Sequence, residues 1–124
     1  MSERRILVVE DDPDGQEVVS RILNHHRIPH VSVRSAEEAL SVLHQGTALT
    51  GAIIDLALPG MDGWTLLNTI HGEANTAGLP CVAMTAFHSS ELAVKAVQAG
   101  FEAYFPKPLD STAFVREIER VFPN

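Results

Sequence analysis

The chain has 124 residues, which is the usual size of one compact domain with a single hydrophobic core. Hydrophobic residues make up 45% and charged residues 20%, a balance that is typical of globular proteins and argues against intrinsic disorder. The formal net charge is −7 and the nine basic residues are scattered. A direct nucleic-acid partner is therefore not expected, because phosphate contacts require clustered Lys and Arg.

The first part of the chain predicts two strands that each lead into a helix. Residues 6–9 form a continuous apolar run that stops at an acidic cluster, as expected of a strand buried on both faces. Asp12 and Pro13 suit the cap and the first turn of a helix. Residues 30–33 indicate a second, shorter strand, and Ser35 opens a capping box for the helix that follows.

The same pattern then occurs three more times. Further apolar runs predict strands at residues 52–54, 81–84 and 103–105. Each run precedes residues with helical periodicity, and Ser89 and Asp110 are the predicted caps of the last two helices. In the helix after Ser89 we expect Leu92, Ala96 and Val97 to be buried.

Five strand–helix units in regular alternation indicate one α/β domain over residues 1–124, with a parallel sheet and right-handed crossovers. Polar side chains follow four of the five predicted strands, at the end where each strand stops. These residues are Glu10, Asp11, Asp55, Thr85 and Lys107. In open parallel sheets, binding sites form at this edge. We therefore expect the five side chains to share one site.

The cellular compartment follows from the cysteine content and from the apolar segments. Cys81 is the one cysteine, so there is no internal disulfide, and its apolar surroundings predict a small core residue in a reducing compartment. The start of the chain lacks the long apolar stretch of a signal peptide, and no segment is long enough to span a bilayer. We expect a cytoplasmic protein with no membrane partner.

The predicted site has the groups that phosphoryl transfer to a carboxylate requires. Three carboxylates at one edge would repel each other unless a cation lies among them, and hard oxygen ligands suit Mg²⁺, with Mn²⁺ as a possible substitute. A carboxylate can attack a phosphoryl group and form an acyl phosphate. The metal and Lys107 would neutralise the phosphoryl oxygens, and Thr85 would offer a hydroxyl to one of them.

Four stretches carry a resemblance to a known family: residues 6–12, 55–63, 84–86 and 104–108. With these stretches in this order at strand ends, the chain resembles the receiver domain of bacterial two-component response regulators, including the chemotaxis receivers. The resemblance implies a doubly wound, flavodoxin-like fold whose five-stranded parallel sheet has the order 2-1-3-4-5. It also implies a phosphorylation-dependent signalling receiver, which is not an enzyme beyond slow autodephosphorylation.

The resemblance also implies partners and a metal site. A histidine kinase or a histidine phosphotransfer protein would donate the phosphoryl group, and a downstream protein target would recognise the phosphorylated form. Asp55 would be both the phosphoacceptor and a metal ligand. Glu10, Asp11 and the backbone carbonyl of Ala57 would be the other ligands of Mg²⁺.

Signal transmission and phosphoryl lifetime would depend on further residues of the same resemblance. Thr85 and Lys107 would hold the phosphoryl group, and Thr85 with Tyr104 would switch the face made by the fourth helix, the fifth strand and the fifth helix. In the family, side chains two residues after the phosphoacceptor and two after the threonine flank the hydrolytic water. Here these residues are Ala57 and Phe87, which cannot hydrogen-bond a water. We therefore predict slow loss of the phosphoryl group.

Three other functions fit this sequence less well. A flavin-binding electron carrier of the same fold would need a phosphate-binding loop after the first strand, and the acidic residues 10–14 would repel a phosphate there. A phosphatase for outside substrates would need a cap insertion for which 124 residues leave no room. A degenerate receiver that acts as a phosphorylation-independent binding module remains the main alternative. A stand-alone receiver is slightly favoured over one cut from a longer regulator.

Overall fold

The computed structural model describes residues 4–87 and 89–122; the remaining residues of the predicted domain lie outside this description. Strands and helices alternate along the chain as predicted. In chain order the elements are β1 (Ile6–Val9), α1 (Pro13–His25), β2 (His30–Val33), α2 (Ala36–His44), β3 (Gly51–Asp55), α3 (Gly63–Gly72), β4 (Cys81–Thr85), α4 (Ser90–Ala99), β5 (Ala103–Pro106) and α5 (Ser111–Val121).

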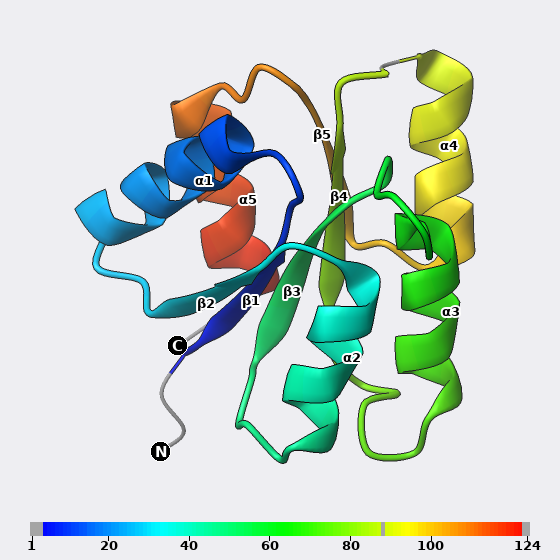
Figure 1. Cartoon of the computed structure of the whole chain (residues 1–124). Helices are drawn as coiled ribbons and strands as arrows, with labels where there is room; N and C mark the ends of the chain where they lie inside the picture. Colours follow the sequence, from blue (N-terminus) through cyan, green and yellow to red (C-terminus); the bar gives the residue numbers. More distant parts are fainter. Residues whose placement is uncertain (1–3, 88, 123–124) are drawn as a thin grey trace.

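The five strands form one parallel sheet with the order β2-β1-β3-β4-β5. Helices α1 and α5 cover one face of the sheet, and α2, α3 and α4 cover the other (Figure 1). The predicted doubly wound fold with the order 2-1-3-4-5 is therefore confirmed. Because all strands are parallel, their C-terminal ends meet at one edge, the upper edge in Figure 1.

The core has two layers because the sheet is buried on both faces. In β1, Ile6 and Val8 pack toward α1 and α5, whereas Leu7 and Val9 pack toward α2 and α3. All four side chains are fully buried. This two-sided burial explains why the strands are continuously apolar and do not alternate between apolar and polar residues.

Side-chain caps begin the five helices. Each cap accepts a hydrogen bond from a backbone amide in the first turn, and the caps are Asp12, Ser35, Asp62, Ser89 and Asp110. The four caps predicted from the sequence are confirmed. The caps fix where each helix begins after its strand, which sets the lengths of the loops that form the upper edge of the sheet.

Helix α4 matches the prediction only in part, and Leu92 is half-buried against the core. Ala96 is fully buried, but the side chain of Val97 is 61% exposed, so the expected burial of Val97 is wrong. Helix α4 packs beside β5, which is an edge strand, and only a narrow strip of the helix meets the core. Val97 follows Ala96 by about 100° around the helix axis and therefore leaves that strip. Val94, on the same outer side, is 57% exposed.

Two further features bear on the sequence interpretation. Cys81 is fully buried in β4, and this burial, with the nearby charge of Glu102, raises the pKa of its thiol to about 12. The thiol is therefore protonated at neutral pH, and its prediction as a core residue is confirmed. Within the part of the chain that is described, no helix has the length and hydropathy required to cross a bilayer.

Candidate functional site

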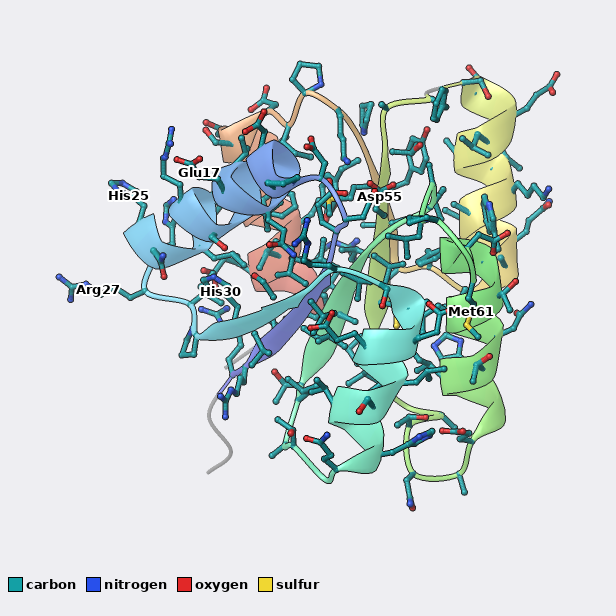
Figure 2. All side chains as sticks on the ribbon, in the orientation of Figure 1. Glu17, His25, Arg27, His30, Asp55 and Met61 are labelled. Atoms are coloured by element: carbon teal, nitrogen blue, oxygen red, sulfur yellow. The ribbon has the colours of Figure 1, made fainter. Side chains whose placement is uncertain are left out.

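The predicted site residues converge at the C-terminal edge of the sheet. Asp55 is the last residue of β3, and Figure 2 shows it at the upper end of the sheet. Glu10 directly follows β1, Thr85 ends β4, and Lys107 directly follows β5. Glu10, Asp55 and Thr85 are all buried. Such burial is unusual for the two carboxylates unless they are paired.

Lys107 joins two of the carboxylates. Its Nζ lies 2.7 Å from Oδ2 of Asp55, and it also forms an ion pair with Glu10. The other oxygen of Asp55, Oδ1, accepts a hydrogen bond of 2.9 Å from the backbone amide of Ala57. Both oxygens of Asp55 are therefore held in place, one by a cation and one by the loop after β3.

Burial and pairing change the protonation of these groups. Burial, followed by a hydrogen bond with Asp55, raises the pKa of Glu10 from 4.5 to about 7, and Lys107 opposes this rise only in part. Burial alone would also raise the pKa of Asp55, but hydrogen bonds from Glu10, Lys107 and the Ala57 amide outweigh it and lower the pKa. Burial would lower the pKa of Lys107, but the two carboxylates outweigh this effect and raise it. Without a metal, Asp55 therefore carries a negative charge throughout the neutral and mildly acidic range, whereas Glu10 is protonated in mildly acidic solution and ionises as the pH rises through about 7.

The carboxylates are also close enough to hold a divalent cation. Glu10, Asp11 and Asp55 each offer an oxygen, and these oxygens lie within 4.8 Å of one another. Asp11 is only half-buried, so the site opens to solvent on its side. A set of hard oxygen donors that leaves room for water fits Mg²⁺. The acidic cluster predicted from the sequence is therefore present, and its chemistry suits the expected metal.

Thr85 ends β4, and Phe87 lies in the loop that follows this strand. The hydroxyl oxygen of Thr85 accepts a hydrogen bond of 3.1 Å from the backbone amide of Phe87. Thr85 is buried, whereas the side chain of Phe87 is 71% exposed. The ring of Phe87 is therefore largely solvated in this structure, and its predicted shielding of a phosphoryl group stays a prediction about the phosphorylated form.

Tyr104 lies on β5, paired in register with Ala83 of β4. Its side chain is half-buried against the hydrophobic layer under α2, α3 and α4. The predicted switch residue is thus on the strand next to the one that ends at Thr85. Its movement on activation stays a prediction.

Sequence reasoning missed two residues that contact Glu10. The side-chain amide of Gln16 in α1 donates hydrogen bonds to the backbone oxygens of Glu10 (2.8 Å) and Val33 (2.9 Å). Gly15, also in α1, lies directly against the Glu10 side chain. A glycine within the first turn of a helix was the available signal, because glycine is a poor helix former and usually has a packing reason there. For Gln16 we find no signal in the sequence.

A five-stranded sheet of this order, with acidic residues, a threonine and a lysine at its C-terminal edge, defines the receiver class of signalling domains. The comparison with protein families agrees: the model of the response regulator receiver domain matches residues 6–119. The chain belongs to this family. Receiver domains of two-component systems interact with histidine kinases and phosphotransfer proteins.

Two relatives show how far the sequence similarity extends. The chain is 30% identical over 120 residues to an uncharacterized 14.6 kDa protein of Leptolyngbya boryana, which covers 97% of this chain and 91% of that protein. It is 36% identical over 116 residues to the response regulator protein FleR of Pseudomonas aeruginosa. That match covers 94% of this chain but only 24% of FleR, so the chain spans about a quarter of the length of that relative.

A solved structure shares the fold. The receiver domain of sensor histidine kinase PA1611 from Pseudomonas aeruginosa PAO1 superposes with a TM-score of 0.87 at 24% identity, over 99% of this chain and all of that one. That structure holds a magnesium ion in its active-site cleft. In the present chain, the carboxylate oxygens of the acidic cluster themselves fit a receiver site for Mg²⁺.

Proposed function

We propose that this protein is a phosphorylation-dependent signalling receiver in which Asp55 accepts a phosphoryl group from a phosphohistidine of a histidine kinase or phosphotransfer protein. The observation that carries the proposal is the pairing of Asp55 with Lys107 at 2.7 Å, inside a cluster whose other carboxylates are Glu10 and Asp11. A buried carboxylate that stays ionised beside a lysine and a divalent-cation site is equipped to attack phosphorus.

The transfer can be written for the residues of this chain. An oxygen of Asp55 attacks the phosphorus, the bond from phosphorus to the imidazole nitrogen breaks, and the imidazole leaves with the electron pair. The amide of Ala57 holds the Asp55 carboxylate in place during this attack. Lys107, already at the carboxylate, would then pair with a phosphoryl oxygen. Glu10, Asp11, Asp55 and the Ala57 carbonyl would hold Mg²⁺, which supplies positive charge for the other phosphoryl oxygens.

The signal would leave the site through Thr85. A hydrogen bond from its hydroxyl to the phosphoryl group would draw Thr85 toward Asp55 and leave space for Tyr104 to turn inward. The new hydrogen bonds would favour the active conformation over the inactive one and remodel the face formed by α4, β5 and α5. A downstream protein would recognise that face. We propose no enzymatic activity on outside substrates, and only slow hydrolysis of the protein's own aspartyl phosphate.

The proposal is tested by intact-mass analysis after incubation with acetyl phosphate and Mg²⁺. The wild type should gain one phosphoryl group, and Asp55→Asn should gain none. Asp12→Asn is a matched control: Asp12 caps α1, and asparagine caps a helix as well as aspartate does, so labelling should be unchanged. Equal labelling of Asp55→Asn, or labelling that persists in EDTA, would contradict the assignment.

The alternative of a phosphorylation-independent binding module predicts a different result. Such a protein would show no labelling, and it would capture its partner equally with and without beryllofluoride, which mimics the phosphoryl group. The proposed receiver should instead bind its downstream target more strongly when beryllofluoride and Mg²⁺ are present. A pull-down under both conditions separates the two functions.

A further inference from the structure

Gly15 lies where any larger residue would touch the Glu10 side chain. A β-carbon built on Gly15 would lie 2.9 Å from Cδ of Glu10 and 3.2 Å from its Cγ, and closer still to the carboxylate oxygen. Gly15 belongs to the first turn of α1, and its backbone amide donates to the cap residue Asp12. Its backbone conformation is an ordinary helical one, so the glycine is not required by the turn itself.

The backbone of Glu10 has little freedom to move away. Its amide donates to the carbonyl of Val33 at 3.1 Å. Its own carbonyl accepts a hydrogen bond of 2.8 Å from the side chain of Gln16, which also binds Val33. Because both backbone groups of Glu10 are anchored, a new atom at position 15 would displace the flexible end of the Glu10 side chain, which is the carboxylate that contacts Lys107.

We propose that Gly15 is a positioning residue for the metal site. Residue 10 is a glutamate, whose side chain is longer than that of an aspartate, and Gly15 leaves the space that this longer side chain needs to reach the site. The inference rests on the proposed function, since it assumes that Glu10 is a ligand of Mg²⁺. Helix α1 would then position a metal ligand as well as cover the sheet. Positions 10 and 15 would also form a matched pair, so that the effect of a methyl group at 15 depends on the residue at 10.

Gly15→Ala should weaken the binding of Mg²⁺ without lowering the stability of the fold. Alanine is a better helix former than glycine, and the nearest atom that must move is the end of a side chain, so Gly15→Ala should leave the thermal midpoint unchanged or raise it. The dissociation constant for Mg²⁺, however, should rise about tenfold, which is the usual scale for losing a contact that orients a metal ligand. A general loss of structure would change both quantities in the unfavourable direction.

The test is a titration with Mg²⁺, read from the backbone amide NMR shifts of Asp12 and Ala57, together with thermal unfolding in EDTA. The variants are Gly15→Ala, Glu10→Asp and the double substitution. Gly15→Ala should weaken binding about tenfold when residue 10 is Glu. In the Glu10→Asp background, the same substitution should change the dissociation constant by less than about threefold, because the shorter side chain ends before the added methyl group.

Gly72→Ala is the matched control. Gly72 is also helical, and a β-carbon there would meet no atom within 4 Å, so stability should respond as for Gly15→Ala while the affinity for Mg²⁺ stays the same. Unchanged affinity in Gly15→Ala, or equal weakening in both backgrounds, would overturn this inference and leave the proposed function intact. A wild type without a saturable response to Mg²⁺ would refute the proposed function and this inference with it.

Discussion

The raised pKa of Glu10 leads to a specific prediction about stability in the absence of metal. In the folded protein, burial and then the hydrogen bond with Asp55 raise the pKa of Glu10 from 4.5 to about 7. An acid with a raised pKa binds its proton more tightly in the folded state than in the unfolded state. The contribution of Glu10 to the free energy of unfolding is therefore fully present below pH 4.5 and is lost as the pH rises through about 7.

The magnitude follows from the two pKa values. At about 1.4 kcal/mol per pKa unit, moving the pKa from 4.5 to about 7 corresponds to about 3–4 kcal/mol, an appreciable part of the stability of a small domain. The lowered pKa of Asp55 acts in the other direction, but its effect falls below its ordinary value of 3.8, outside this window. We therefore expect the free energy of unfolding in EDTA to decrease by about 3 kcal/mol between pH 4.5 and pH 8.

Urea unfolding at several pH values measures this decrease. Glu10→Gln removes the titrating group and keeps the shape of the side chain, so its stability should depend much less on pH over the same range. Saturating Mg²⁺ should also reduce the decrease, because a bound cation favours the ionised carboxylate. A wild-type free energy of unfolding that is flat or increases over this range, or an equal decrease in Glu10→Gln, would refute the reasoning.

Three further predictions concern signal transmission, phosphoryl lifetime and the core. Lys107→Ala and Thr85→Ala should retain metal binding but lose the beryllofluoride-induced NMR shift changes at residues 89–122; a wild-type response confined to the metal site would count against the proposed switch. Ala57→Asn and Phe87→Glu should each speed the loss of phosphate in Mg²⁺, and the double variant should be fastest, because polar side chains can orient the hydrolytic water. Loss of phosphate from the wild type as fast as from the double variant would contradict this prediction. Phe114→Ala should lower the free energy of unfolding by about 3–5 kcal/mol in urea, since this fully buried ring packs edge-to-face on Phe105; a loss under about 1 kcal/mol would contradict that packing.

The architecture could be predicted because each local signal in the sequence agrees with the global fold. All four side chains of the apolar run 6–9 can be buried only if the strand is covered on both faces. Helix α1 packs on one face and helix α2 on the other. Asp12, Ser35 and Asp110 predict helix starts through a local hydrogen bond that needs no distant partner. The order of the strands came from the family resemblance, because strand periodicity alone does not specify which strands are neighbours.

The error at Val97 has a different origin. Helical periodicity predicts that one side of α4 is apolar, but it does not predict how wide a strip the neighbouring elements cover. An edge position beside β5 covers a narrow strip, which includes Ala96 and leaves Val94 and Val97 outside. The width of a buried strip is a property of tertiary packing, and it was not available from the sequence.

The same distinction separates the parts of the site that sequence reasoning found from the parts that it missed. Asp55, Thr85 and Lys107 could be assigned to one site because parallel strands all end at one edge, whatever the details of packing. The clearance between Gly15 and the Glu10 carboxylate depends instead on how deeply the first turn of α1 lies against the end of β1. Residues 10 and 15 are separated by a cap and a proline, and nothing in their spacing specifies that depth. The chemical groups of the site can thus be predicted from the sequence. The fit between neighbouring elements sets how firmly each ligand is held, and it can be seen only in the three-dimensional structure.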